Sequence, residues 1–407
     1  MIEVTIDRLG QQGDGIAAGP DGAVYAARCL PGERVAGVLE GDRIVAPRVL
    51  DPAPERVNPP CPHYAACGGC ALLHASDGFV AGWKRDVMVR ALAAQGLAAP
   101  IRGIATSPAR SRRRAALSGR RTRMGAVVGF HGRASDALTA VTSCRVLTPA
   151  IVAGLPLLEE ITALGGSRKG ELTLTVTDTP AGLDVAVTGG PAPAGALMAA
   201  LPGLATRGLA RLTWGDEVLA QQAPPALALG RARVVPPPGA FLQATAHGQA
   251  ALVAAVRAAV GDARRVADLF AGCGTFALPL AQGAEVLAVE GDGAMLAALT
   301  AGWRGAPGLR PVQVRTRDLF RAPLEGADLA GFDAVVIDPP RAGAAAQAAA
   351  LAAAGPLRIA SVSCNPATFA RDAKLLVAGG YRLDWIAVVD QFRWSCHVEL
   401  AAQFTRR

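Results

Sequence analysis

Short apolar segments recur through the C-terminal part of the chain, at residues 266–270, 285–289, 312–315 and 332–337, and most of them end in a glycine or proline corner. Helix-type segments separate them, and this alternation predicts βαβ units and a parallel sheet. Residues 236–407 are therefore expected to form a doubly wound, Rossmann-like α/β domain. Ligands of such sheets bind beyond the carboxyl ends of the strands, so polar residues at those ends are the first candidates for chemistry.

Two of these strand ends carry reactive side chains. Cys364 follows an apolar run and is stopped by Pro366, and Asp338 ends another run before Pro339-Pro340. An isolated cysteine in such a place is most simply a buried thiol beside a turn. Because about one crossover unit separates the two segments, adjacent strands would bring both side chains to one site. Cys364 and Asp338 are therefore candidate catalytic residues.

A glycine-rich turn follows the first predicted strand of this region. It lacks both the Lys-Ser/Thr of a phosphate loop and the third glycine of the dinucleotide fingerprint, so a nucleoside ligand such as S-adenosylmethionine fits it better. Glu290 ends the next strand, where a carboxylate can accept hydrogen bonds from ribose hydroxyls. Asp318 follows strand 312–315 and could meet an adenine amino group or merely cap a helix. Asp268 and Phe270 belong to the predicted strand before the turn, and Gly272, Gly274 and Thr275 belong to the turn itself.

Three of the eight cysteines lie within ten residues, at Cys61, Cys67 and Cys70, with two glycines between the last two. This grouping indicates ligation of a metal or cluster instead of a disulfide framework. Cys144 is the best candidate for a fourth ligand. An iron–sulfur cluster is our first interpretation, because zinc prefers paired C-x-x-C units or added histidines. Zinc is the second interpretation, and free thiols are the third.

The remaining chain divides into two further predicted domains. Residues 1–52 read as short strands separated by glycines, which suggests an OB-like β-barrel or a β-domain without a ligand. Residues 53–235 are expected to form a central α+β domain that holds the cluster and an RNA-binding surface. It contains helix-type segments at 82–92 and 149–165 and a predicted hairpin over 171–187. A long helix should then run to about residue 260.

The charge of the chain points to a polyanionic partner. The net charge is +8 and the sequence pI is about 9.4. Seven arginines fall within residues 110–123, and we expect phosphate contacts there, although a solvated face is the alternative. No apolar run is long enough to span a membrane, and the N-terminus lacks the layout of a signal peptide. We therefore expect a cytoplasmic protein, and we assume that it acts as a monomer.

Together these motifs resemble the RNA uracil-C5 (5-methyluridine) methyltransferases, a family of S-adenosylmethionine enzymes. The resemblance implies a TRAM β-barrel at the N-terminus and a [4Fe–4S] cluster on Cys61, Cys67, Cys70 and Cys144. It further implies a cofactor site at Phe241-x-Gln243, Asp268 to Gly274, Glu290, Asp318 and Asp338. Cys364 would be the nucleophile, and Glu399, in His397-Val398-Glu399, the base. The chain departs from the family pattern at Arg393-Trp394-Ser395, where Pro-His-Thr is frequent, and at Thr245, where asparagine is frequent.

The expected reaction is methyl transfer to C5 of a uridine in RNA. Uracil C5 is a weak nucleophile, so a cysteine thiolate must first add to C6, and a base must later remove the C5 proton. Arg341 stands where enzymes that methylate amino groups usually carry an aromatic residue, which favours a carbon target. We expect 23S ribosomal RNA as substrate. The alternatives are a transfer RNA uridine, another RNA base and, least favoured, a non-catalytic RNA-binding or redox protein.

Overall fold

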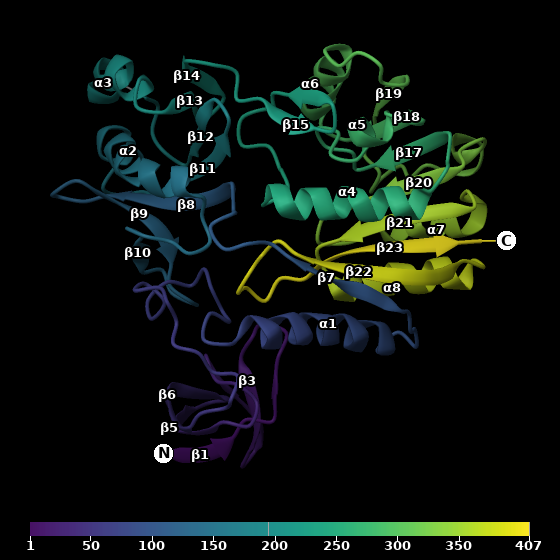
Figure 1. Ribbon diagram of the computed structural model, residues 1–407. Coiled ribbons are helices and arrows are strands. Elements are labelled where there is room, and N and C mark those ends of the chain that lie inside the picture. The colour runs from purple at the N-terminus through teal and green to yellow at the C-terminus, as the bar shows by residue number, and fades with distance from the viewer. Residues whose placement is uncertain (194, 407) are drawn as a thin grey trace.

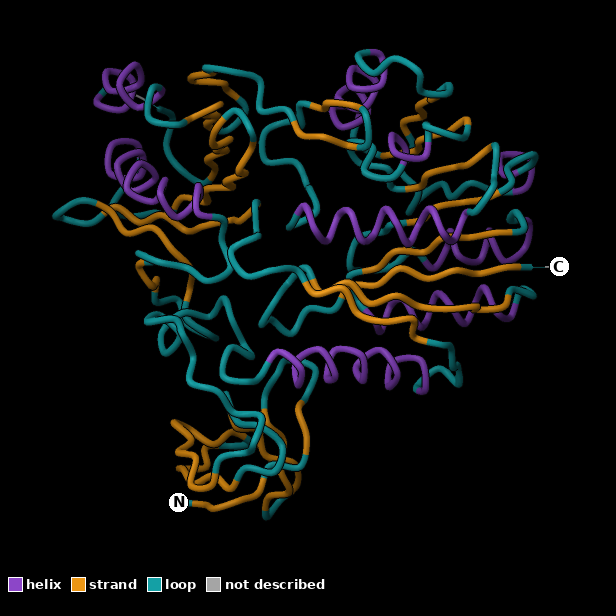
Figure 2. Tube along the Cα trace, in the orientation of Figure 1, coloured by secondary structure: helices purple, strands orange, loops and turns teal. Residues whose placement is uncertain are grey.

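Figure 1 presents the computed structural model of the protein, which describes residues 1–193 and 195–406. Within these residues the strands form sheets of six, seven, two and eight strands. The two largest sheets lie side by side, and the N-terminal sheet projects from below them, as the trace in Figure 2 also shows. In the described part of the chain, no helix is long and apolar enough to cross a membrane.

The first 51 residues form the six-stranded sheet, in the order β1-β5-β6-β4-β3-β2. The short strands predicted for this segment are therefore present. Ile6, Val24, Val35 and Ile44 are buried and form its own small core. The strands are β1 (Ile2–Thr5), β2 (Arg8–Leu9), β3 (Gly15–Gly19), β4 (Gly22–Ala26), β5 (Arg34–Glu40) and β6 (Arg43–Asp51).

The seven-stranded sheet has the order β10-β9-β8-β11-β12-β13-β14 and packs against helices α2 (Pro149–Gly165) and α3 (Ala196–Ala205). Pro149 at the first turn of α2 suits a helix start, because its missing N–H would have no partner there. The helix and the hairpin predicted in this region are confirmed. The strands are β8 (Arg114–Arg121), β9 (Ala126–His131), β10 (Leu138–Ala140), β11 (Leu172–Thr179), β12 (Gly182–Thr188), β13 (Leu209–Trp214) and β14 (Glu217–Gln221).

The eight-stranded sheet has the order β19-β18-β17-β20-β21-β23-β22-β7. Its central strands are parallel and buried on both faces, which explains their continuous apolar sequences. The strands are β7 (Ile101–Thr106), β17 (Arg265–Leu269), β18 (Glu285–Glu290), β19 (Val312–Thr316), β20 (Ala334–Ile337), β21 (Arg358–Ser363), β22 (Arg382–Asp390) and β23 (Glu399–Thr405). The doubly wound α/β fold predicted for this region is confirmed.

Helices cover both faces of this sheet. Helix α4 (Ala246–Val260) packs on one face, across β21, β22 and β23. On the other face lie α1 (Asp77–Ala93), α7 (Ala345–Ala354) and α8 (Pro366–Ala378), with α1 against α8. The remaining elements are the strand pair β15 (Leu227–Leu229) and β16 (Ala232–Val234), helices α5 (Ala277–Leu280) and α6 (Gly293–Arg304), and the 3₁₀ turn η1 (Gly326–Leu329).

Two features of this topology position the site. Strand β17 lies between β18 and β20, so the carboxyl ends of all three open onto the same edge. Strand β23 runs antiparallel to β21, and Leu400 pairs with Ser363, which brings the start of β23 beside the end of β21. Helix α1 and strand β7 also join this sheet, although their residues fall within the range 53–235 expected for the central domain.

Candidate functional site

Cys364 lies at the carboxyl end of β21, immediately before α8. Asn365 caps that helix, because its side-chain oxygen accepts a hydrogen bond from the N–H of Ala367 at 3.1 Å. The Cys364 thiol is half-buried. Burial, followed by the nearby charges of Glu399 and Asp338, raises the pKa of Cys364 to about 11, while Arg341 acts in the opposite direction. The thiol is therefore surrounded by groups that can exchange protons, and it is protonated in the free protein at neutral pH.

Glu399 begins β23 and is buried. Burial, with a further contribution from the charge of Asp338, raises its pKa to about 8. Gln391 holds the carboxylate in place, because its Nε2 donates hydrogen bonds both to Glu399 Oε2 and to Gln243 Oε1. Glu399 and Cys364 lie at the ends of two paired strands, where Ser363 pairs with Leu400, and the charge of Glu399 acts on the Cys364 thiol. A carboxyl group with this pKa can take up and release protons near neutral pH.

Two further carboxyl groups lie at this edge of the sheet. Burial raises the pKa of Asp338, just beyond the end of β20, to about 7. Asp268 lies within β17 and is fully buried, and neither of its carboxylate oxygens has a hydrogen-bond partner among the described residues. Its burial and the charges of Asp338 and Glu290 raise the pKa of Asp268 above its ordinary value. Unpartnered carboxylate oxygens in a buried strand end fit a ligand that supplies hydrogen-bond donors.

The glycine-rich turn after β17 brings main-chain N–H groups next to Glu290. Glu290 Oε2 accepts a hydrogen bond from Gly272 N at 3.0 Å, and its other oxygen accepts from Gly291 N at 2.7 Å. Gly272 and Gly274 both have positive φ angles, of 53° and 93°. A side chain at Gly274 would meet Leu278 and Leu299 at 2.9 Å, so only glycine fits. Thr275 continues the turn and is half-buried.

Asp318 and Phe270 flank this edge. The Asp318 Oδ1 atom accepts hydrogen bonds from Phe320 N at 2.9 Å and from Arg321 N at 3.3 Å, which is the geometry of a turn cap. Phe270 has a positive φ of 61°, and its ring lies 5.3 Å from the ring of Phe320. Asp318 therefore makes the capping contacts that the sequence offered as the alternative to a cofactor contact. It follows β19 and so also lies next to the strand ends.

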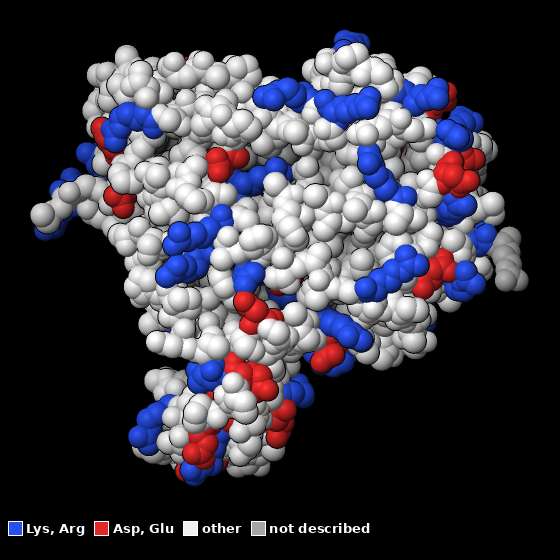
Figure 3. Space-filling view, viewed as in Figure 1, with Lys and Arg blue, Asp and Glu red and all other residues white. Residues whose placement is uncertain are grey.

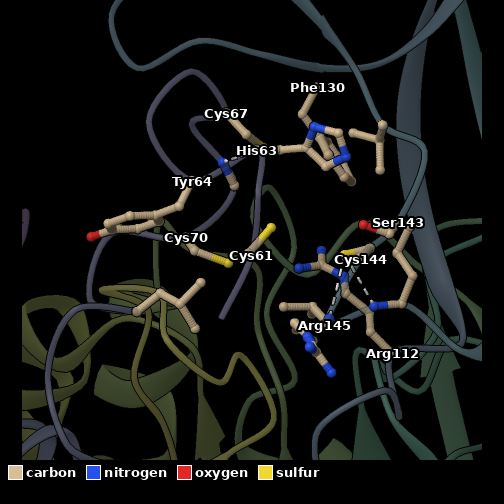
Figure 4. Close-up of a pocket in the computed structure, with 15 residues that line it drawn as sticks. Cys61, His63, Tyr64, Cys67, Cys70, Arg112, Phe130, Ser143, Cys144 and Arg145 are labelled. Carbon is tan, nitrogen blue, oxygen red and sulfur yellow. Dashed lines mark hydrogen bonds between the residues drawn. The ribbon is translucent and has the colours of Figure 1, made fainter. Parts of the chain in front are cut away.

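The four predicted cysteine ligands meet at a different place. Cys61, Cys67, Cys70 and Cys144 line one cavity between the segment 61–70 and the loop after β10. Figure 4 shows Cys70 and Cys144 entering the cavity from opposite sides. Within residues 1–193 and 195–406, however, no three Cys, His, Asp or Glu side chains are arranged to hold a single metal ion.

The surroundings of these thiols suit an anionic, sulfur-bound group. Cys144 Sγ accepts hydrogen bonds from Val146 N at 3.3 Å and Leu147 N at 3.4 Å, and Cys67 Sγ accepts one from Gly69 N at 3.4 Å. Such N–H donors favour thiolates. The tight path of the segment requires glycine, since a Cβ at Gly68 would lie 2.8 Å from His131 O.

Arg112 adds a cation to the same cavity. Its side chain lines the cavity, and the thiols of Cys144 and Cys70 are the charges that act on its guanidinium. The guanidinium also lies 5.5 Å from the ring centre of Phe392. Burial lowers the pKa of Arg112, which an anionic occupant of the cavity would offset.

The arginine-rich segment divides into two groups. Arg112, Arg113 and Arg114 are half-buried and donate to backbone or side-chain oxygens: Arg113 to Gln243 O and Gln249 Oε1, and Arg114 to Gly239 O and Ala240 O. Arg113 and Arg114 thus join the start of β8 to α4 and to the segment before it, whereas Arg112 donates to Arg114 O. The exposed members are Arg110, Arg120, Arg121 and Arg123. Basic side chains are spread across the face in Figure 3, including a group between the two largest sheets. The expectation of phosphate contacts therefore applies only to the exposed arginines.

The sequence did not single out Gln391, although it joins Gln243 to Glu399. The distances along the chain explain this, because Gln391 and Gln243 are 148 positions apart. It also did not single out the buried ion pair of Lys84 and Asp390, whose partners are 306 positions apart. Pairs of residues so far apart leave no local pattern in the sequence. The position of Asp390 at the end of an apolar strand was nevertheless a signal that could have identified it as a candidate.

Comparisons with known proteins relate this chain to RNA methyltransferases. A family model described as tRNA (Uracil-5-)-methyltransferase matches residues 312–407. The chain is 42% identical over 405 residues to an RNA methyltransferase of Brucella suis, with 99% of this chain and 98% of the relative covered. It is 35% identical over 449 residues to the 23S rRNA (uracil(1939)-C(5))-methyltransferase RlmD of Alkalilimnicola ehrlichii, with 100% and 96% covered.

One solved structure is similar over its whole length. The Pyrococcus abyssi tRNA (uracil-54, C5)-methyltransferase, solved with S-adenosyl-L-homocysteine, superimposes with a TM-score of 0.76, and 99% of each chain is covered. The sequence identity is 21%, so this likeness concerns the fold. The arrangement of all three large sheets is therefore shared with a known protein.

Proposed function

Because the chain belongs to the RNA uracil-C5 methyltransferase family, we propose that it transfers a methyl group from S-adenosylmethionine to C5 of a uridine in RNA. The observation that carries the proposal is that Cys364 directly follows β21 and Glu399 begins the neighbouring strand β23, close enough for the charge of Glu399 to act on the Cys364 thiol. A thiol and a carboxyl group at neighbouring strand ends are the two groups that this reaction needs.

Cys364 is the proposed nucleophile. Its thiol loses a proton and adds to uracil C6, which places the electron pair of the C5=C6 bond in an enolate. A nearby carboxylate, Asp338 or Glu399, is the acceptor for the thiol proton, since the pKa values of both are raised toward neutrality. Arg341 counteracts the rise in the pKa of the Cys364 thiol and so favours the thiolate. S-Adenosylmethionine, when bound, supplies an electrophilic methyl group, which C5 accepts.

Glu399 is the proposed base for the last step. After methylation C5 still carries its proton, and the ionised Glu399 removes it. The electron pair then reforms the C5=C6 bond and expels the Cys364 thiolate, which completes the cycle. A thiolate suits both roles, because it is a strong nucleophile and a good leaving group. Since the target carbon lies within a base stack, the uridine must be flipped out or taken from a loop.

We propose that S-adenosylmethionine binds along the carboxyl ends of β17, β18 and β20. The unpartnered carboxylate of Asp268 and the Glu290 carboxylate offer acceptors there. Glycine at 272 and 274 lets the turn approach a ligand closely. The full proposed set is Gln243, Asp268, Phe270, Gly272, Gly274, Thr275, Glu290, Asp318 and Asp338.

For the second cavity we propose a [4Fe–4S] cluster held by Cys61, Cys67, Cys70 and Cys144. In a cubane cluster each thiolate binds a different iron, so the sulfurs stay farther apart than the about 4 Å expected around one tetrahedral zinc ion. Four thiols that line one cavity, with main-chain N–H donors to two of them, support this proposal. When bound, the cluster would link segment 61–70 covalently to the loop at Cys144.

The proposed substrate is 23S ribosomal RNA, with transfer RNA as the alternative. The 35% identity to a 23S rRNA enzyme over the whole chain supports the first. We further propose a TRAM-like module at residues 1–52, a central cluster- and RNA-binding module within 53–235 and a methyltransferase module at 236–407, which α1 and β7 complete. The protein would work as a cytoplasmic monomer.

The direct test is methylation in vitro with S-adenosylmethionine that carries a labelled methyl group. Unmodified 23S rRNA and a pool of unmodified transfer RNA are incubated separately with the protein, and nucleosides are identified by mass spectrometry. Labelled 5-methyluridine in the 23S rRNA alone is the expected result. Label in transfer RNA alone would replace the substrate but keep the reaction, and label on another base would overturn the proposed site.

A further inference from the structure

Helix α1 holds the loop that leads to Glu399 through a fully buried ion pair. Lys84 Nζ lies 2.5 Å from Asp390 Oδ1 and also donates a hydrogen bond to Phe392 O at 3.0 Å. The side chains of Lys84 and Asp390 are only 0% and 1% exposed. Because removing two charges from water is costly, a buried ion pair adds little net stability to the fold, and stability alone does not explain why it is present. Its two acceptors flank Gln391, and the pair therefore fixes the backbone on both sides of that residue.

Gln391 connects the segment held by this ion pair to Glu399. Both donor positions of its Nε2 are used, by Glu399 and by Gln243, and its Oε1 accepts a hydrogen bond from Thr245 N at 3.3 Å. The residue is 2% exposed, so the amide has no water to turn toward. A displacement of Gln391 would therefore leave the Glu399 carboxylate without its donor.

Helix α1 contacts the same loop a second time through Asp77, which lies two helical turns before Lys84. Asp77 accepts hydrogen bonds from Arg393 Nη2 and, at 3.0 Å, from Trp394 Nε1. Arg393 also donates to Ser107 O at 3.0 Å, and Ser107 Oγ lies 2.8 Å from Thr245 Oγ1. The two places where the sequence departs from the family pattern thus belong to one hydrogen-bonded network that closes through Asp77.

We propose that Asp77 and Lys84 are positioning residues that hold the segment 390–394 and, through Gln391, place the Glu399 carboxylate for proton removal. The inference rests on the proposed function and adds to it a role for α1. Neither residue touches the reacting atoms. Their contribution is therefore to the proton transfers that Glu399 performs, above all the removal of the C5 proton, and not to RNA binding.

The principal variant is Asp77→Ala, and its matched control is Asp86→Ala. Asp86 is exposed on the same helix and carries the same charge. Asp77 is also largely exposed, so its loss should leave the fold intact. We expect Asp77→Ala to lower kcat about tenfold with KM for RNA unchanged, and to accumulate the covalent protein–RNA intermediate on ordinary RNA. Asp77→Glu should recover part of kcat, and Asp86→Ala should match the wild type.

The buried pair is tested with Lys84→Met and with the double variant Lys84→Met/Asp390→Leu. The single variant leaves a buried charge without a partner and should lower the Tm, whereas the double variant should recover it. We expect kcat to stay low in the double variant, because Phe392 O still lacks its donor. A kcat that recovers together with the Tm would reduce the pair to a structural role and contradict the proposal.

Hydrogen exchange separates this proposal from the proposed function. The backbone amides of residues 391–398 should exchange faster in Asp77→Ala than in Asp86→Ala, whatever reaction the protein performs. Faster exchange in Asp77→Ala, together with a wild-type protein that never traps an RNA adduct, would mean that α1 holds segment 390–394 as proposed but that the proposed function is wrong. If exchange in Asp77→Ala is unchanged and its kcat is within twofold of the wild type, the proposed positioning role of Asp77 is wrong.

Discussion

Two sites in this chain are built from cysteine, and they differ in what surrounds the sulfur. In the cavity of Cys61, Cys67, Cys70 and Cys144, the neighbours are other thiols, main-chain N–H groups and Arg112. At the end of β21, the neighbours of Cys364 are carboxyl groups whose own pKa values are raised. Burial raises the pKa of Cys70 to about 12 and that of Cys364 to about 11, so neither thiol ionises by itself at neutral pH.

The groups around a cysteine sulfur indicate the role of that cysteine. Thiols that raise one another's pKa ionise when a bound cation stabilises the thiolates, which is the behaviour of metal ligands. A single thiol beside a carboxylate can pass its proton to that neighbour, which is the behaviour of a nucleophile. Variants at the two sites should therefore differ in their effects on activity and stability.

The largest expected effect is the loss of the nucleophile. Cys364→Ala should lower methyl transfer by about 10⁴-fold or more, because the uncatalysed C5 carbon is too weak a nucleophile. Single-turnover methylation with labelled S-adenosylmethionine measures this. Cys67→Ser is the matched control, as it removes a thiol from the other site, and it should retain more than a tenth of the activity. Equal losses in both variants would erase the distinction between the two sites.

Next in size is the loss of the base. Glu399→Gln keeps the shape of the side chain but cannot accept the C5 proton, and turnover should fall by about 10²–10⁴-fold. The methylated RNA should remain attached to Cys364, and denaturing gels would show it as a slowly migrating band. Fast turnover without such a band would mean that another group removes the proton.

A smaller effect concerns pH. The pKa of Glu399 is raised to about 8, so its ionised fraction increases with pH below that value. The single-turnover rate of adduct release should rise about tenfold per pH unit from pH 6 and level off above pH 8. A rate that is flat between pH 6 and pH 8 is the contrary result.

Stability supplies the control for this profile. A raised carboxyl pKa means that the folded state prefers the protonated form, so the stabilisation is complete below the ordinary pKa and is lost as the pH rises through about 8. Glu399→Gln should therefore raise the Tm relative to the wild type at pH 9 by about 2–4 °C. The difference should shrink at pH 6.

The smallest effect on catalysis is expected in the cysteine cavity. Protein purified without oxygen should absorb broadly in the visible range, and Cys70→Ser should lose that absorption. The variant should also lose about 2 kcal/mol of unfolding free energy or more, which corresponds to a Tm lower by about 4–8 °C. Its activity should fall only a few-fold. Zinc without iron in elemental analysis would contradict the cluster.

Much of the fold could be predicted from the sequence, because its signals are local. The apolar runs that became β17, β18 and β20 carried their own period and their own turns, and the helix predicted at 149–165 has those bounds in the structure. The placement of α1 and β7 could not be predicted. They lie far from the rest of the eight-stranded sheet in sequence and join it only through long-range packing.

The candidate site was predicted where residues sit at strand ends, and missed where they act through partners. Cys364, Asp338 and Glu399 each follow or begin an apolar strand, so their meeting follows from the topology. Gln391 and Lys84 have no such mark, since each gains its role from contacts made across more than a hundred residues. Side-chain hydrogen bonds between distant elements have no periodic signal in the sequence.

The most direct test of the central claim is a trapping experiment on Cys364. The protein is incubated with S-adenosylmethionine and RNA that contains 5-fluorouridine, and the products are analysed by mass spectrometry. Fluorine at C5 cannot be removed as a proton, so the cycle stops before the thiolate leaves. We predict a covalent adduct between methylated RNA and the peptide that carries Cys364. If ordinary RNA is methylated but no adduct forms, Cys364 is not the nucleophile and the account is wrong.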